Sequence, residues 1–176
     1  MKLTLVLTFL TLYTVANGQK AHPTARCDES LWEHVYAGDA RRFEKPEDRL
    51  QIIERCKTVT GMIVSMKPEG DGDYHLQLRL DSGQPGLLNN KNRSGQRGNL
   101  VIETICMKTP TQRTALKDGS CTRFRQKFVA LTQVRANIKK KKPTHVEITG
   151  AYITDMEHGW NEIHPVTSIT LKPKSR

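Results

Sequence analysis

The sequence predicts a mostly β protein whose five strands close into a small barrel. A short helical extension precedes the first strand, and one helix or loop insert separates strands three and four. Two observations carry this prediction: period-two alternation of apolar and polar residues, and runs rich in β-branched residues between turn-forming residues. The five predicted strands are residues 58–66, 73–81, 99–106, 145–154 and 160–171.

The N-terminal part favours helices. Apolar residues at helical spacing predict a short helix over 28–37. Pro46 suits a first helical position and opens a second segment. Leu50, Ile52 and Ile53 form the buried side of that segment if it is helical, although it is extended in the alternative interpretation.

The first two strands have the clearest patterns. The first, 58–66, contains Gly61, as a strand that bends to serve two sides of a barrel does. After the turn at 67–72, residues 73–81 alternate, with leucines facing one way and Asp73, His75, Gln77 and Arg79 the other. This pattern is typical of a half-buried strand.

The remaining elements complete the fold class. Residues 82–98 are predicted to form a polar loop. In the basic stretch 107–143, Phe124, Phe128 and Leu131 recur at helical spacing and predict a helix between strands three and four. Five strands with a helix at this place favour an OB-like closed barrel, because a β-sandwich needs about seven strands.

The N-terminus predicts export. Lys2 precedes an apolar run, and small residues at Ala16 and Gly18 suit cleavage before Gln19. The apolar run is shorter than the roughly 20 residues that a membrane span needs. We therefore expect a secreted or periplasmic protein with no membrane span. The predicted organisation is a signal peptide at 1–18, a helical or irregular extension at 19–56, an OB-like domain at 57–171 and a basic tail at 172–176.

Four cysteines in an exported chain favour disulfides. They allow three pairings, of which the two local bonds Cys27–Cys56 and Cys106–Cys121 are preferred. A zinc site is the alternative, but no Cys-x-x-Cys pair is present.

The chain is basic, with 28 Lys and Arg against 18 Asp and Glu and a net charge of +10. Such a field favours a polyanionic partner, either nucleic acid or an acidic polysaccharide, but it does not define a fold or a function. Asn92-Arg93-Ser94 forms a glycosylation sequon, which matters only in a glycosylating pathway. The sequence leaves the oligomeric state open. The candidate contacts to an anion are Arg79, Arg93, Arg97, Lys139, Lys140, Lys141 and Lys142.

Two clusters could carry chemistry, 71–75 and 158–165. Asp73 and His75 lie two apart on one strand and share a face, as do Trp160, Glu162 and His164 on another. The candidate ligands for a divalent transition metal are His75, His158, Glu162 and His164, with Asp73 as a ligand or base. A hydrogen-bonded structural cluster is one alternative. A non-metal ligand site that uses Asp73, His75 and Trp160 is another.

The same clusters also carry a resemblance. Asp71-Gly72-Asp73-Tyr74-His75 and His158-Gly159-Trp160-Asn161-Glu162-Ile163-His164-Pro165, together with 56–61 and 150–152, resemble segments of small exported, OB-fold-like bacterial proteins of unassigned function. The resemblance covers roughly residues 50–170. It implies a barrel and marks the two clusters, but it transfers no catalytic residue, and the insert at 107–143 is long for that pattern.

Two functions follow as hypotheses. The first is a binding module for an anionic ligand, because OB barrels bind oligonucleotides and oligosaccharides on one face. The second is a metal-dependent hydrolase of the phosphodiesterase or nuclease kind, in which a metal activates water beside a phosphate. The sequence contains no recognisable catalytic constellation, which favours the binding module.

Overall fold

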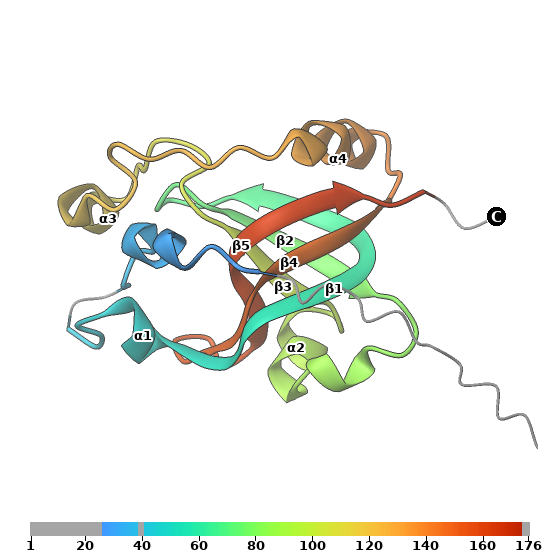
Figure 1. Cartoon of the computed structure of the whole chain (residues 1–176), viewed down its shortest axis with the longest axis horizontal. Helices are drawn as coiled ribbons and strands as arrows, with labels where there is room; N and C mark the ends of the chain where they lie inside the picture. Colours follow the sequence, from blue (N-terminus) through green and yellow to red (C-terminus); the bar gives the residue numbers. More distant parts are fainter. Residues whose placement is uncertain (1–25, 39–40, 174–176) are drawn as a thin grey trace, which may run out of the picture.

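The computed structural model describes residues 26–38 and 41–173, so the predicted signal peptide at 1–18 lies outside the described residues. The described chain is mostly β, and its five strands form one mixed sheet that closes into a ring in the order β1-β2-β3-β5-β4 (Figure 1). This confirms the predicted class and number of strands. The strands are β1 Leu50–Pro68, β2 Tyr74–Leu80, β3 Leu100–Thr104, β4 Thr144–Asp155 and β5 Asn161–Leu171.

Strand β1 is long because it pairs with two neighbours. Its first part runs antiparallel to β4, as far as the Ile63–Thr144 pair, and its second part runs antiparallel to β2 from Gly61 onward. A Cβ at Gly61 would lie 2.3 Å from the carbonyl oxygen of Arg79, so only glycine allows the two backbones to approach this closely. The predicted bend at this residue is therefore where the strand passes from one partner to the other.

The parallel pairing of β3 with β5 closes the ring, and every other neighbouring pair is antiparallel. Val101 of β3 lies opposite Glu162 of β5, while His75 of β2 lies opposite Glu103 of β3. The polar residues of three strands are thereby brought onto one outer face.

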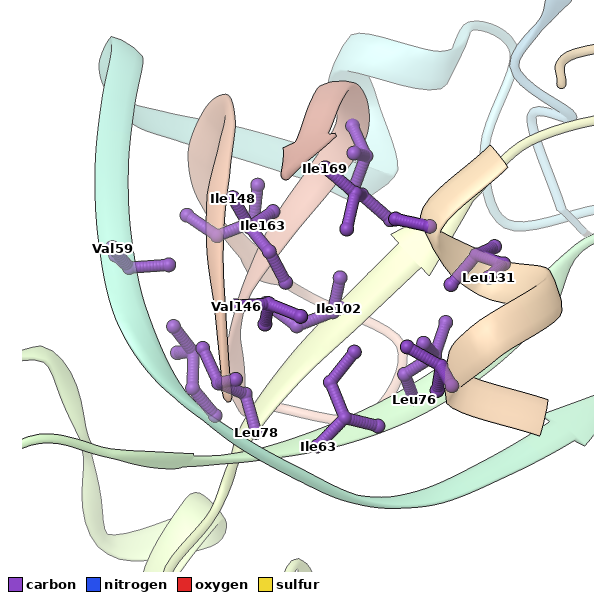
Figure 2. Packing of buried hydrophobic residues seen from close by; sticks show 14 of the residues in the cluster. Val59, Ile63, Leu76, Leu78, Ile102, Leu131, Val146, Ile148, Ile163 and Ile169 are labelled. Atoms are coloured by element: carbon purple, nitrogen blue, oxygen red, sulfur yellow. The ribbon is translucent and has the colours of Figure 1, made fainter. Parts of the chain in front are cut away.

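Apolar side chains from all five strands fill the ring. Val59, Leu76 and Ile163 point into the interior, and Leu131 enters it from helix α4, which spans Val129–Lys139 (Figure 2). Leu131 is 4% exposed. Helix α4 therefore covers one side of the ring, whereas α2, Asn90–Gly95, lies on the opposite side (Figure 1).

A second apolar cluster lies outside the ring. It joins Leu31 of the 3₁₀ helix η1, Glu29–His34, to Ile153 of β4 and to the Cys106–Cys121 disulfide. The structure contains both preferred disulfides: Cys27–Cys56 ties the N-terminal segment to β1, and Cys106–Cys121 closes the loop after β3. No helix among the described residues is long and apolar enough to span a membrane.

Several boundaries differ from the prediction. The helix expected over 28–37 is the shorter η1, and the second helix, α1 Pro46–Arg49, ends before Leu50. Strand β1 begins at Leu50, so the last residues of the predicted extension 19–56 belong to the sheet. The extended alternative is therefore correct and the helical one is wrong: Ile52 pairs with Ile153 of β4, and Ile52 and Ile53 are 36% and 53% exposed instead of forming a buried helix face.

The insert between β3 and β4 holds two helices, α3 Arg113–Asp118 and α4. Phe124 and Phe128 precede α4, so their helical spacing with Leu131 was misleading. Hydrogen bonds hold this segment in an irregular conformation. The guanidinium of Arg125 donates to two nearby carbonyl oxygens, and the amide of Gln126 connects Ile105, just after β3, to Val166 of β5.

The predicted polar loop 82–98 contains η2, Pro85–Leu87, and α2. Asn89 caps α2 by accepting from the backbone N–H groups of Lys91 and Asn92. Asn92 is fully buried, and its side chain donates to the carbonyl oxygens of Asn99 and Asn161. The sequon asparagine is therefore a structural link, inaccessible to glycan transfer in the folded chain.

Candidate ligand-binding site

A polar cavity of about 530 Å³ lies on the outer face of β2 and β3. The turn between β1 and β2 contributes Glu69 to its wall, and the turn between β4 and β5 contributes His158. Residues from both predicted clusters, far apart in the sequence, therefore meet here. The lining residues are Val64, Ser65, Lys67, Glu69, His75, Gln77, Gly95, Gln96, Arg97, Asn99, Glu103, His158 and Trp160.

His75 and Glu103 form a pair across β2 and β3. The Nδ1 of His75 lies 2.8 Å from Oε1 of Glu103, and each side chain is 14% exposed. Burial lowers the pKa of His75, but the hydrogen bond and charge of Glu103 outweigh burial and raise it. Burial also raises the pKa of Glu103, although His75 opposes the change. On its other side, the Nε2 of His75 faces Oε1 of Gln96 at 3.4 Å.

His158 repeats this arrangement at the β4–β5 turn. Its Nδ1 lies 3.0 Å from Oδ2 of Asp155, and this hydrogen bond raises the pKa of His158. The imidazole stacks on the indole of Trp160 with 4.3 Å between ring centroids. Because the side chain of His158 is 47% exposed, it offers an aromatic surface to solvent.

Glu162 and His164 lie beneath the cavity and do not line it. Glu162 accepts from Trp160 Nε1 at 2.9 Å and from His164 Nδ1 at 2.9 Å, so Trp160, Glu162 and His164 share one face as predicted. Burial lowers the pKa of His164, but its hydrogen bond to the carboxylate of Glu162 outweighs burial and raises it. The Nε2 of His164 has no hydrogen-bond partner among the described residues.

Asp73 is 3% exposed and supports the loop after β3. Its Oδ1 accepts from the backbone N–H of Cys106 at 2.7 Å. Burial raises the pKa of Asp73 well above its ordinary value, and the nearby charge of Asp71 adds to that effect. Asp73 is absent from the cavity wall, so the structure gives it a supporting role.

The four candidate metal ligands lie in two places, the wall of the cavity and the buried layer beneath it. His75 and His158 line the cavity, while Glu162 and His164 are buried and bonded to each other. Within residues 26–38 and 41–173, the one group of three close ligand atoms is Asp73, Cys106 and Cys121. The two sulfurs of that group form a disulfide and are not thiolate ligands.

The predicted cationic contacts are also divided. Arg97 lines the cavity, whereas Arg93 donates to the carbonyl oxygen of Leu88 outside it. Arg79 is exposed on the same strand as His75, further from the β1–β2 turn. The lysine run Lys139–Lys142 is exposed at the end of α4 and the turn after it, away from the cavity wall.

The partners that orient the two imidazoles, Glu103 and Asp155, could not be predicted from the residue pattern. Glu103 lies in the predicted strand 99–106 and Asp155 lies between the fourth and fifth predicted strands, and the residue pattern marks neither as a partner of a histidine. Alternation along β3 does place Glu103 on the outer face. Its position opposite His75 depends on strand register, which one sequence does not define.

The sequence matches no protein-family model, and no curated protein is detectably similar to it. The cavity residues and their contacts are therefore the basis for inferring what the protein does.

Proposed function

We propose that the protein is an exported OB-like binding module that takes a segment of single-stranded nucleic acid in the cavity over β2 and β3. The observation that carries this proposal is the position of the cavity between the β1–β2 and β4–β5 turns. OB folds bind oligonucleotides with the face of strands two and three and the loops of these same pairs.

The OB-like assignment rests on the connections of the ring. The strand order β1-β2-β3-β5-β4, the parallel closure of β3 on β5 and a helix between β3 and β4 agree with a five-stranded Greek-key barrel. The two disulfides are typical of exported proteins and support the predicted secreted or periplasmic location.

The chemistry of the cavity favours nucleic acid over an acidic glycan. His158, backed by Trp160, offers a ring on which a base can stack. The amides of Gln77 and Asn99 line the cavity; each amide nitrogen gives one hydrogen to Gln96, and its second hydrogen and the amide oxygen suit the edges of bases. Exposed Lys67 and Arg97 stand at the same cavity and suit phosphate oxygens.

Fluorescence anisotropy with a labelled single-stranded oligonucleotide at two or more salt concentrations tests the proposal. Each phosphate contact on a single strand contributes about −0.7 to the slope of log affinity against log salt. We expect Lys67→Ala with Arg97→Ala to make that slope shallower by about 1.4, if each cation neutralises one phosphate. An acidic glycan is the competing ligand. If an unlabelled acidic glycan displaces the labelled oligonucleotide and unlabelled nucleic acid does not, the cavity is a glycan site.

The matched control removes the same charge elsewhere. Lys140→Ala with Lys141→Ala alters the predicted lysine contacts, which are exposed and lie outside the cavity wall. We expect this pair to change the slope less than the cavity pair. A larger effect of the lysine-run pair would place the ligand near α4 and contradict the cavity assignment.

A further inference from the structure

The two imidazoles of the cavity are held in the same way. In His75 and in His158, Nδ1 faces a carboxylate, from Glu103 at 2.8 Å and from Asp155 at 3.0 Å. Both rings neighbour Trp160, with 6.0 Å and 4.3 Å between centroids. A carboxylate on Nδ1 fixes the ring and directs Nε2 to other partners, as in catalytic histidines that transfer protons.

The partners of the two Nε2 atoms differ. The Nε2 of His75 lies 3.4 Å from the side-chain amide oxygen Oε1 of Gln96, an acceptor that favours a proton on this nitrogen. No hydrogen bond to the Nε2 of His158 is found within the described ranges, and this ring is the more exposed of the two. One imidazole is therefore arranged to give a proton and the other to take one.

We propose that the cavity cleaves single-stranded RNA by general acid–base catalysis, with His158 as base and His75 as acid. This inference rests on the proposed function, because the strand must first bind in the cavity. The chemistry needs no nucleophile from the protein, because the ribose supplies its own 2′-hydroxyl.

In the proposed step, Nε2 of His158 accepts the proton of the 2′-hydroxyl. The 2′-oxygen attacks the adjacent phosphorus, so a P–O2′ bond forms and the P–O5′ bond breaks. Nε2 of His75 gives its proton to the leaving 5′-oxygen. The products are a 2′,3′-cyclic phosphate and a free 5′-hydroxyl, and no other reactant is consumed.

Two cationic side chains line the same cavity as the imidazoles. Lys67 is the strand partner of His75 on β1, and Arg97 lines the same cavity. Fixed positive charges beside the phosphorus stabilise the additional negative charge of the transition state. Lys67 and Arg97 therefore act on both binding and rate, whereas His75 and His158 act mainly on rate.

The test incubates the purified full-length chain with an end-labelled RNA oligonucleotide in EDTA, and with the same sequence as DNA. We expect RNA to be cut to cyclic-phosphate ends and DNA to be bound but left intact. His75→Gln and His158→Asn should each slow cleavage by about 100-fold or more, the range for a general acid or base. RNA affinity should change far less.

His145→Gln is the matched control. His145 also pairs with a carboxylate, Asp81 at 2.8 Å, but it lies outside the cavity wall. This variant should cleave RNA as fast as the wild type does. If His75→Gln and His158→Asn also cleave as fast as the wild type, the activity comes from a contaminating nuclease and the proposal is overturned. Thermal melting of each variant separates loss of catalysis from loss of the fold.

The other outcomes separate the two proposals. RNA that binds but stays intact overturns the catalytic inference and leaves the binding module in place. An absence of both binding and cleavage overturns both. Cleavage that stops in EDTA and returns with added divalent ions overturns acid–base catalysis by the two imidazoles alone and supports the metal-dependent hydrolase.

Discussion

At the residue scale, buried charges define the support beneath the cavity. Glu162 and His164 are 1% and 2% exposed at their side chains, and they face each other at 2.9 Å. Removing one partner of a buried pair leaves an uncompensated charge, which is strongly destabilising. Because Glu162 also accepts from Trp160, it links the buried level to the aromatic wall of the cavity.

The pH dependence of stability tests the buried charges through Asp73. A carboxyl whose folded-state pKa exceeds its unfolded value stabilises the fold below the unfolded pKa, and this contribution is lost as pH rises through the folded pKa. Asp73 has a raised pKa, mainly because it is buried. Its contribution to stability is therefore lost as pH rises above 3.8, the ordinary pKa of an aspartate. His164, raised from 6.5, contributes in the same direction at higher pH.

We therefore expect the free energy of unfolding to fall as pH rises above 3.8. Asp73→Asn keeps an acceptor for the N–H of Cys106 but cannot ionise, so its stability should fall less steeply with pH. Urea denaturation across this window measures both slopes. A variant slope as steep as that of the wild type would show that Asp73 does not titrate as described.

The cavity residues could be predicted only in part from the sequence. Alternation places His75 on a polar strand face and groups Trp160 with Glu162 and His164, and the structure agrees. The depth of each residue was not accessible from alternation. Asp73 is buried against the disulfide loop, where it accepts from the N–H of Cys106, and His164 is buried beside Glu162.

At the scale of single elements, α4 closes one side of the ring. Its residues Ala130, Leu131 and Val134 are buried, whereas Val129 is 90% exposed. Apolar spacing predicted a helix here, but it could not define the start. The disulfide and the bonds of Gln126 hold the residues before α4 in an irregular path.

Leu131→Ala tests the contribution of α4. Loss of a buried leucine side chain costs about 2–5 kcal/mol through lost transfer energy and the cavity left behind. Val129→Ala, on the same helix, should change stability by no more than about 0.5 kcal/mol because its side chain is exposed. Equal losses in the two variants, measured by denaturant unfolding, would contradict the packing of α4 on the ring.

At the scale of the whole molecule, the closed strand order brings two distant turns to one cavity. The number of strands and the helix between β3 and β4 could be predicted from the sequence, since strand periodicity and the length of the insert are local signals. The pairing of β3 with β5 joins residues about sixty positions apart. Such non-local register leaves no periodic trace in a single sequence.

The net charge of +10 favours association with polyanions in general, whichever part of the surface they contact. Affinity alone therefore does not locate the ligand. The fluorescence of Trp160 can locate the ligand, because Trp160 lines the cavity. The chain has one other tryptophan, Trp32, which lies in η1. A Trp32→Phe variant makes Trp160 the single indole reporter.

The most direct measurement is the emission of Trp160 in Trp32→Phe during titration with single-stranded DNA, beside anisotropy of the same oligonucleotide. A strand in the cavity should quench Trp160 with the same midpoint as the anisotropy change, and both midpoints should move together with salt. Saturable binding by anisotropy with unchanged Trp160 emission would contradict the cavity as the binding site.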